Sequence, residues 1–434
     1  MQNRREFLGA LPVVAAAAGI CLNPISAARA AEVAENLSQW PGSPEEIARD
    51  ESFWFEVARA YSVDRSLVNL NNGGVSPAPV MVQDAVKRHL DYANSAPPAY
   101  ALWRVQNPQR EGVRKRLARQ FGCDPEELAI TRNTSESLQI CQFGFDLKAG
   151  DEVVTSDRDY PRMITTFKQR ERREKINLKM ISLKGLETDP AGMVARFREA
   201  ITPRTRLILI SHMVFYNGQI LPVKEIVAMA RKQGVPVLVD GAHALAHFEF
   251  TMADLDCDYY ASSLHKWLGA PHGTGFLYVR RNRIPSLWPL MAASEAEDAD
   301  IRKFEEIGTH SLAHTLAIAE ALTFHQGIGP DRKEARFIHL RDYWAGKLLE
   351  NPRVRLHTPL ERGFACGIAT FEIKGIDPGK LTGWLWKHHH ILTTSMKHTD
   401  FQGTRVSPNM YTTLEELDRF VEAVEYVLEH GLPG

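Results

Sequence analysis

Three hydrophobic runs in this sequence end on side chains that can do chemistry. Together they supply an acid, an amine and several hydroxyl and imidazole groups: Asp240 and His243 in VPVLVDGAHA, Ser263, His265 and Lys266 in DYYASSLHKW, and Thr134 and Ser135 in LAITRNTSES. Ligands of open α/β sheets collect where strands end at their carboxyl side, so these groups are expected to meet at one edge. The helix start predicted at Thr134 adds backbone amides that suit an anion.

This combination is what pyridoxal phosphate (PLP) requires. Its aldehyde needs a lysine amine, its pyridine nitrogen needs a carboxylate to stay protonated, and its phosphate needs amide and hydroxyl donors. Each group alone has an ordinary role: a strand-end aspartate caps a turn, NTSE caps a helix, and a lone lysine lies on the surface. The three together favour a PLP site with Lys266 as the amine and Asp240 as the carboxylate.

The elements that position these groups follow from hydrophobic periodicity. Strand patterns at 127–131, 151–156, 178–183, 205–211 and 235–240 alternate with helical patterns at 79–93, 108–122, 133–144, 161–175, 190–201 and 222–234. This alternation predicts βαβ units and a mostly parallel sheet with helices on both faces. After about residue 330, short strands at 354–358 and 368–375 and helices at 380–390 and 413–431 predict a separate α+β domain.

Composition excludes several other classes of protein. The chain has 434 residues, 44% of them hydrophobic, and a net charge of −1. A balanced charge without a Lys/Arg block argues against a nucleic acid or an anionic membrane as partner. The five cysteines show no CxxC or metal-ligand spacing, so disulfides remain open and no metal site is predicted. The run His388–His390 is interpreted as a solvated helix end, because adjacent helical residues do not share a face.

The N-terminus resembles a twin-arginine (Tat) export signal. Arg4 and Arg5 precede an Ala-rich stretch that is shorter than the ~20 residues of a membrane span. Ala28–Ala30 then gives an A-x-A-like cleavage site. The resemblance implies a mature protein that starts near Ala31 and reaches the periplasm folded, with its cofactor inserted. We divide the chain into a signal (1–30), an N-terminal segment (31–80), a large domain (81–330) and a small C-terminal domain (331–434).

VDGAHA followed by SSLHKWLGAPHGTGFLYV resembles the class V aminotransferase family of fold-type I PLP enzymes, and the likeness extends from LNNGGVSPAPV to RVSPNMYTTLEELD. It implies a large domain with a mostly parallel seven-stranded sheet, a smaller α+β domain and a homodimer. It also implies that Lys266 bonds to the PLP aldehyde and then moves the substrate's Cα proton.

The resemblance also implies roles for the remaining candidates. It assigns the cofactor contacts as follows: Asp240 to the pyridinium nitrogen, His243 to the phenolic oxygen, Tyr160 to stacking on the ring, Ser263, His265, Thr134 and Ser135 to the phosphate, and Thr309 to a partner subunit's phosphate. Arg405 in TRVSP would take the substrate carboxylate, a task suited to a planar guanidinium. Asn72 is a further predicted substrate contact, and Trp103 and Arg104 are candidates by position.

Departures from the family pattern indicate the branch. Cysteine desulfurases need a thiol on the loop before the C-terminal arginine, and ILTTSMKHTDFQGTRVS has no cysteine. Phe215 and His243 stand where desulfurases carry asparagine and glutamine, and both favour the isopenicillin N epimerase-like branch. A Tat-exported enzyme of this branch resembles the periplasmic PLP enzyme that acts in maturation of the siderophore pyoverdine. That enzyme converts a glutamate side group of the siderophore to succinamide.

Other functions remain open from the sequence. Within the same family, the alternatives are epimerisation, transamination or C–S lysis of another small amino acid or peptide. A non-catalytic PLP-fold binding protein is disfavoured because Lys266, Asp240 and Arg405 are all present. A nucleotide-binding oxidoreductase is disfavoured because GAPHGTG lacks G-x-G-x-x-G spacing and follows the lysine.

Overall fold

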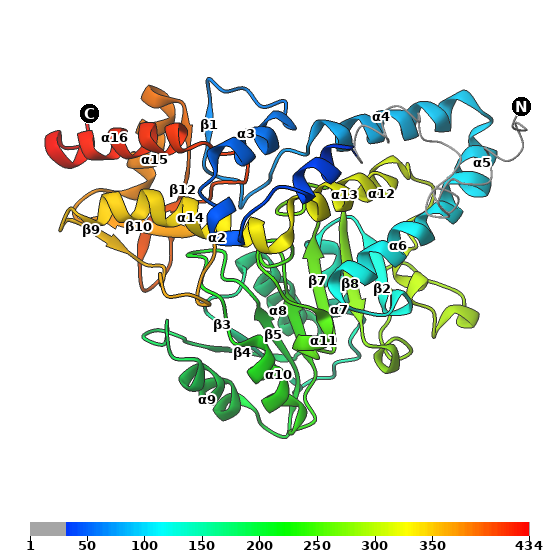
Figure 1. Ribbon diagram of the computed structural model, residues 1–434. Helices are drawn as coiled ribbons and strands as arrows, with labels where there is room; N and C mark the ends of the chain where they lie inside the picture. The colour runs from blue at the N-terminus through cyan, green and yellow to red at the C-terminus, as the bar shows by residue number, and fades with distance from the viewer. Residues whose placement is uncertain (1–31, 434) are drawn as a thin grey trace, which may run out of the picture.

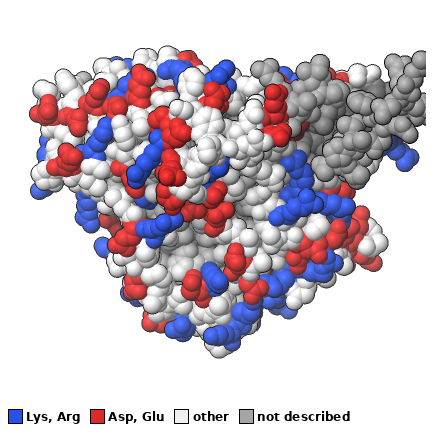
Figure 2. All heavy atoms as spheres, viewed as in Figure 1, with Lys and Arg blue, Asp and Glu red and all other residues white. Residues whose placement is uncertain are grey.

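The computed structural model describes residues 32–433 (Figure 1). The predicted export signal, residues 1–30, and the cleavage point before Ala31 lie outside the described residues. Among the helices of the described part, none combines the length and apolar character needed to cross a membrane. Basic and acidic side chains intermingle over the face seen in Figure 2, as the balanced composition leads one to expect.

A seven-stranded sheet forms the centre of the large domain. Its strands, in spatial order, are β2 (Leu128–Thr131), β8 (Gly275–Val279), β7 (Tyr259–Ser263), β6 (Val237–Asp240), β5 (Thr205–Ser211), β3 (Glu152–Ser156) and β4 (Asn177–Ile181). All neighbouring pairs are parallel except those that involve β8, which runs antiparallel to both β2 and β7. The predicted mostly parallel seven-stranded sheet is confirmed.

The inner strands of the sheet are buried on both faces, whereas the edge strand β4 is partly exposed. Along β5, Leu207 and Leu209 pack into one core while Ile208 and Ile210 pack into the other. The helices of the large domain include α4 (Val80–Ser95), α6 (Asn107–Phe121), α7 (Thr134–Gly144), α8 (Pro161–Glu174), α9 (Pro190–Ala200), α10 (Val223–Arg231) and α13 (Ile318–Ile328). Figure 1 shows α7 and α8 on one side of the sheet and α9 and α10 on the other.

The second domain is built on a four-stranded antiparallel sheet. Its strands, in spatial order, are β12 (Thr394–Lys397), β13 (Gln402–Val406), β10 (Ala369–Ile373) and β9 (Val354–Leu356). The helices α14 (Pro330–Leu349), α15 (Pro378–His389) and α16 (Leu414–His430) accompany it. His390 ends α15 in the left-handed conformation with φ 55°, which fits the predicted helix end.

The N-terminal segment joins this second domain. The short strand β1 (Val68–Asn69) pairs in parallel with β11 (Ile391–Leu392), and Asn71 bridges to Ser407. Val68 and Leu70 are part of the small-domain core. The residues directly after β1 are therefore held against the small domain at the edge of the large one.

Gly241 offers a test of packing immediately behind the strand-end acid. A Cβ added at Gly241 would overlap the buried ring of Tyr260, whereas a Cβ at Gly346 in α14 would meet nothing. We expect Gly241→Ala to lower the free energy of unfolding by about 1–3 kcal/mol through overpacking. Gly346→Ala, the control, is expected to raise it by about 0.5–1 kcal/mol because alanine favours the helix. Urea titrations of both variants measure this, and an unchanged Gly241→Ala midpoint would contradict the packing.

Candidate active site

A cavity of about 450 Å³ lies where the strands of the large sheet end against the small domain. Nine of the predicted site residues line it: Thr134, Ser135, Tyr160, Asp240, His243, Ser263, His265, Lys266 and Arg405. The structure therefore brings together residues that lie up to 271 positions apart in the chain. Asn72 and Thr309 are not among the residues that line this cavity.

Lys266 and Asp240 follow two adjacent parallel strands, β7 and β6. Asp240 is the last residue of β6 and pairs with Ala261 of β7, so the two strands end side by side. Burial raises the pKa of Asp240 to about 6 and lowers that of Lys266 to about 8, because removal from water disfavours both charges. The positive charge of Lys266 partly offsets the rise in the pKa of Asp240, and the negative charge of Asp240 partly offsets the fall in the pKa of Lys266. The pair is thus held nearer to neutrality than either group is in water.

His243 stands beside the amine. The Lys266 Nζ lies 3.2 Å from the His243 Nε2. Burial, together with the positive charge of Lys266, holds the pKa of His243 well below its usual value, so the imidazole is neutral and its Nε2 accepts from the lysine. The buried Nδ1 of His243 finds no partner among the described residues. The backbone carbonyl of His243 accepts a hydrogen bond of 2.8 Å from His247 Nδ1. The ring of His247 in turn stacks on the ring of Trp267, with 3.8 Å between the ring centroids.

A group of hydroxyls and amides lies at the start of α7. The Thr134 amide donates to Ser263 Oγ at 3.0 Å, and the two hydroxyl oxygens are 2.7 Å apart. Asn133 caps the helix by accepting from the Glu136 amide at 2.9 Å. A Cβ on Gly275 would come within 2.7 Å of the Asn133 Cα, so glycine is required there for β8 to approach the helix start.

Arg405 lies on the opposite wall, in β13 of the small domain. It is fully buried, and desolvation lowers the pKa of its guanidinium to about 10. Nη1 donates to the Phe215 carbonyl at 2.8 Å and Nη2 donates to Asn71 Oδ1 at 3.0 Å. The buried Nε has no hydrogen-bond partner among the described residues. A buried N–H without a partner is costly, and a guanidinium that lines a cavity is suited to an anionic ligand there.

The adjacent Asn71, rather than Asn72, lines the cavity. Asn72 is completely buried, and its amide donates to the carbonyls of Asn69 and Ser407 while its oxygen accepts from the Tyr411 hydroxyl at 2.7 Å. All of its polar capacity is used within the protein. The predicted substrate contact at Asn72 is not brought to the site, and Asn71 is the asparagine that reaches Arg405.

Tyr160 lines the cavity at the N-cap of α8, and its ring meets the Phe215 ring edge to face at 5.0 Å. It is 37% exposed, so the cavity opens to solvent beside it. Thr309 instead lines a separate surface hollow together with Trp103. Arg104 lies in the same π-helical turn as Trp103, Ala101–Gln106, outside the cavity.

Sequence patterns did not reveal several residues of this region. Met213 and Met396 line the cavity as apolar groups that carry no chemical signature. Asp159 is a buried carboxylate behind the site that accepts from both the amide and the hydroxyl of Ser156 and of Ser211. Burial raises the pKa of Asp159, and these donors oppose the rise.

A second buried lysine lies behind the site. Lys333 in α14 is completely buried and donates to the Trp267 carbonyl at 2.7 Å and to His325 Nδ1 at 3.1 Å. Burial lowers its pKa to about 7. Lys333 does not line the cavity, so of these two buried amines only Lys266 faces it. In the sequence, Lys333 is indistinguishable from a surface cation on an amphipathic helix.

The geometry fits PLP. One cavity holds an amine, a carboxylate at the next strand end, an imidazole with an unpaired buried nitrogen, and hydroxyl and amide donors at a helix N-terminus. These are the groups that the aldehyde, the pyridine nitrogen, the phenolic oxygen and the phosphate of PLP require. When bound, PLP supplies an electron sink that stabilises negative charge on a substrate carbon.

Comparison with known proteins agrees with this geometry. Residues 68–420 match the class V aminotransferase family. The chain belongs to that family. It is 31% identical to isopenicillin N epimerase of Streptomyces clavuligerus over 389 residues, which covers 86% of this chain and 98% of the relative. It is 26% identical to a probable cysteine desulfurase of Halalkalibacterium halodurans, which covers 84% and 94%.

Solved structures share the fold. A variant of C-DES with glycine covalently linked to its PLP cofactor superimposes with a TM-score of 0.74 at 24% identity, covering 82% of this chain and 96% of that one. A cysteine desulfurase of Escherichia coli gives 0.74 at 21% identity and covers 90% and 99%. The chain is a fold-type I, PLP-dependent enzyme of the class V aminotransferase family, with pyridoxal phosphate as its cofactor.

The lowered pKa of Lys266 gives a testable pH dependence. Only the neutral amine attacks the aldehyde of PLP, so the rate of covalent capture by the apoenzyme is expected to rise about tenfold per pH unit and to level off above about pH 8. Stopped-flow absorbance of PLP mixed with apoenzyme measures the rate. Lys266→Ala, the control, should show no covalent capture. A midpoint near the ordinary lysine value would contradict the burial effect.

Proposed function

We propose that this enzyme acts on the amino-acid end group of a larger molecule, whose carboxylate is held by Arg405 while its amine is presented to Lys266. The observation that carries the proposal is a buried guanidinium, that of Arg405, lining the same cavity as the amine, with one N–H that has no partner among the described residues. Lys266 then removes or returns the proton at Cα, and Asp240 keeps the pyridine nitrogen protonated. Because the pKa of His243 is well below its usual value, the imidazole beside the amine is neutral and adds no positive charge that would repel a protonated Lys266.

The cavity does not favour sulfur transfer. The hairpin of β12 and β13, which walls the cavity next to Arg405, contains no cysteine. The nearest cysteine upstream of that hairpin, Cys366, is buried and donates to the His247 carbonyl at 3.4 Å. Burial raises the pKa of the Cys366 thiol well above its usual value, so it is a poor nucleophile. A desulfurase needs a mobile thiolate, and no described cysteine lines the cavity.

The substrate that we propose is the glutamyl side group of a pyoverdine-type siderophore, converted to succinamide in the periplasm after Tat export. Two observations support it. The half-exposed Tyr160 leaves the cavity open to solvent, as an end group attached to a larger peptide requires. The N-terminal Arg4-Arg5 pattern is typical of exported enzymes that carry a cofactor. The conversion breaks the bond from Cα to its carboxylate, which leaves as carbon dioxide, and turns Cα and its amine into a primary amide. With dioxygen as the oxidant it balances as R–CH(NH2)–COOH + O2 → R–C(O)NH2 + CO2 + H2O.

A second candidate is epimerisation at Cα of a small peptide. The 31% identity to isopenicillin N epimerase over 98% of that relative favours it. Epimerisation uses the same carboxylate site and the same amine, but it needs no oxidant. Transamination and C–S lysis would use the same carboxylate site and the same amine, and they differ from epimerisation in their products.

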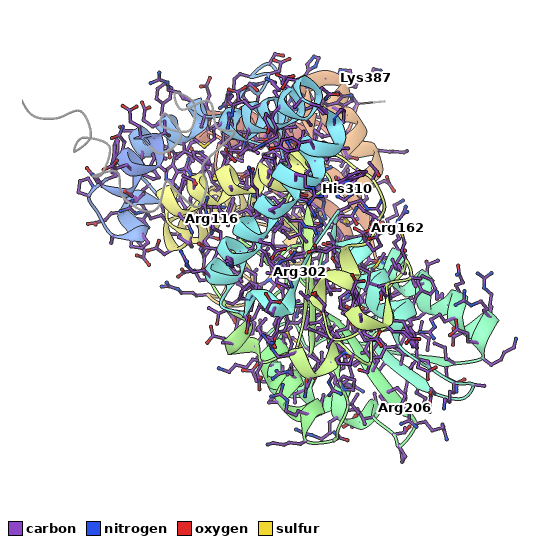
Figure 3. The ribbon with its side chains drawn as sticks, turned by 90° about the vertical axis from the view of Figure 1, so that its right-hand side faces the viewer. Arg116, Arg162, Arg206, Arg302, His310 and Lys387 are labelled. Atoms are coloured by element: carbon purple, nitrogen blue, oxygen red, sulfur yellow. The ribbon has the colours of Figure 1, made fainter. Side chains whose placement is uncertain are left out.

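We also propose that the enzyme is a homodimer. Thr309 and Trp103 line one surface hollow of about 300 Å³, and Trp103 is 59% exposed. Figure 3 faces this side of the molecule, where Arg302 and His310 are labelled. A second copy that covered this hollow would hold Thr309 at the interface, as a contact with the partner's phosphate site requires.

Replacement of Arg405 tests the carboxylate site. Lysine keeps the charge but loses the planar fork, so we expect Arg405→Lys to weaken binding of L-glutamate to the holoenzyme by about 10- to 100-fold. Spectral titration of the bound cofactor measures the dissociation constant. Arg355→Lys, on the exposed side of the small domain in β9, is the control and should bind as the parent does. Equal affinity for all three proteins would contradict the proposed role.

Product analysis separates the candidate reactions. The holoenzyme is incubated in air, in deuterated buffer, with a siderophore that carries a glutamyl side group. The proposed reaction predicts oxygen uptake, carbon dioxide release and a succinamide product by mass spectrometry. Epimerisation predicts deuterium at Cα without oxygen uptake, and transamination predicts a keto acid. An unchanged siderophore, with the Lys266→Ala protein as background, would contradict the proposed substrate.

A further inference from the structure

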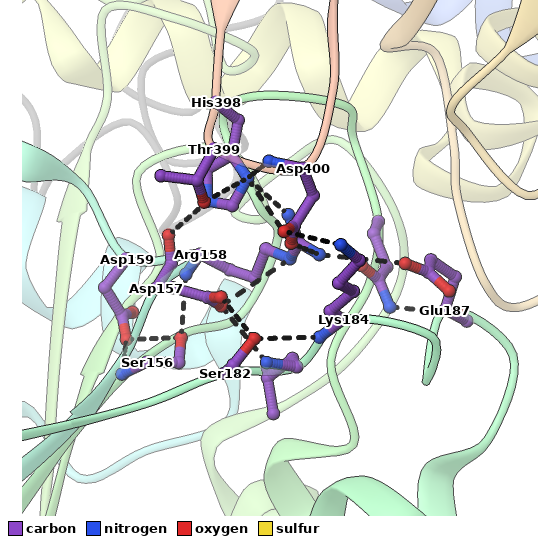
Figure 4. A network of polar contacts seen from close by, with 12 residues as sticks. Ser156, Asp157, Arg158, Asp159, Ser182, Lys184, Glu187, His398, Thr399 and Asp400 are labelled. Carbon is purple, nitrogen blue, oxygen red and sulfur yellow. Dashed lines mark hydrogen bonds and ion pairs between the residues drawn. The ribbon is translucent and has the colours of Figure 1, made fainter.

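Arg158 is a buried arginine at the boundary between the two domains (Figure 4). It lies in the turn between β3 and α8, and its side chain is 1% exposed. A buried cation is stable only where partners replace its lost water. The closest partners of Arg158 belong to one segment of the small domain, the turn 398–401 between β12 and β13.

This turn is held at several points. Arg158 Nη1 donates to His398 Nδ1 at 2.8 Å, and Nη2 donates to Asp400 Oδ2 at 2.9 Å. The guanidinium carbon lies 5.5 Å from the centre of the Phe401 ring, within the range of a cation–π contact. His398 Nε2 in turn donates to the Asp157 carbonyl at 2.9 Å. The turn is therefore fixed to the large domain by both side chain and backbone.

Two carboxylates and an imidazole in this region could serve as metal ligands, but they already contact the positive side chains of Arg158 and Lys184. Asp157, His398 and Asp400 present ligand atoms within 4.8 Å of one another. The His398 Nδ1 lone pair and an oxygen of Asp400 accept from Arg158, and Lys184 Nζ lies 3.6 Å from the other oxygen of Asp400. The guanidinium thus neutralises this cluster, and its acceptors serve to bind the two domains together.

The strands on either side of the turn form the substrate wall of the cavity. Thr394 in β12 pairs directly with Arg405 in β13, and both line the cavity. On the other side, the turn that carries Arg158 continues within two residues to Tyr160, which also lines the cavity. One buried arginine therefore joins the base of the wall that carries Arg405 to the base of the wall that carries Tyr160.

The two walls also touch within the cavity. Arg405 donates to the Phe215 carbonyl, and the Phe215 ring meets Tyr160 edge to face at 5.0 Å. Phe215 lies in the large domain, after β5. If the turn 398–401 moved away, Arg405 would keep its own charge but lose its fixed place relative to the amine of Lys266. Accurate placement of a substrate between two groups depends on such fixed supports.

We infer that Arg158 is a positioning residue that locks the β12–β13 hairpin to the large domain and so sets the place of Arg405 in the cavity. This inference rests on the proposed function in one respect, the role of Arg405 as the carboxylate site. Arg158 itself does not line the cavity. It acts through the hairpin.

The test compares Arg158→Met and Arg158→Lys holoenzymes by hydrogen exchange and by L-glutamate binding. In Arg158→Met we expect faster amide exchange confined to residues 394–406, and a dissociation constant for L-glutamate raised about tenfold. The bound PLP absorbance should stay unchanged, and Arg158→Lys should recover part of the affinity. The control is Arg206→Met, which breaks an exposed 3.1 Å pair with Asp151 at the other end of the sheet (Figure 3).

The outcomes separate this inference from the proposed function. If the parent enzyme does not bind L-glutamate, the proposed role of Arg405 fails, and exchange at 394–406 alone then decides for or against the lock. Unchanged exchange and unchanged affinity in Arg158→Met would overturn the inference. Should Arg158→Met fail to fold, Asp400→Asn removes the charge of one partner while its amide oxygen can still accept from Nη2, so it weakens the same contact with the same shape, and the same two readouts apply.

Discussion

The structure depends on a lysine and an aspartate that share one desolvated cavity. Taking a lone amine or carboxylate out of water is expensive, and each group escapes part of that cost by approaching neutrality. The pKa of Asp240 rises to about 6 and that of Lys266 falls to about 8, which is the direction that prepares one to pair with a ring nitrogen and the other to attack an aldehyde. Burial in the fold thus gives both groups pKa values shifted toward the range in which catalytic groups act.

The parallel sheet makes this arrangement possible. The strands β6 and β7 are neighbours with the same direction, so their last residues emerge at the same edge. The helix α7 starts at that edge because β2, which precedes it, is antiparallel to β8 and so runs in the same direction as β7, and Gly275 lets β8 lie close to this helix start. The small domain then closes the cavity with Arg405, which donates to the Phe215 carbonyl of the large domain. The cavity is thus walled by residues of both domains.

The parts that the sequence predicted share a local signal. The strand ends at Asp240 and Ser263 follow directly from apolar runs, and the helix start at Thr134 follows from its capping residues, so all three reach the cavity as expected. Asn72 differs because it lies in the turn after β1, where its side chain bonds within the protein while that of Asn71 lines the cavity. The register of such a short segment is set by its contact with Ser407, which no periodicity reveals.

Contacts between distant segments could not be predicted in this way. Arg158 and Lys333 look like surface cations in the sequence, and their burial depends on partners far along the chain, such as Asp400 and Trp267. The place of Thr309 in a partner's site stays a prediction because it concerns a second subunit. Chemical groups at strand ends were therefore predictable, whereas the supports that hold the two domains together were not.

The most direct measurement is the site of cofactor attachment. The purified holoenzyme is reduced with borohydride, digested and analysed by peptide mass spectrometry, so that any lysine bonded to PLP carries a stable label. The account predicts the label on the peptide that contains Lys266 and on no other, including the peptide of the second buried lysine, Lys333. A label on Lys333 or elsewhere, with Lys266 unmodified, would contradict it.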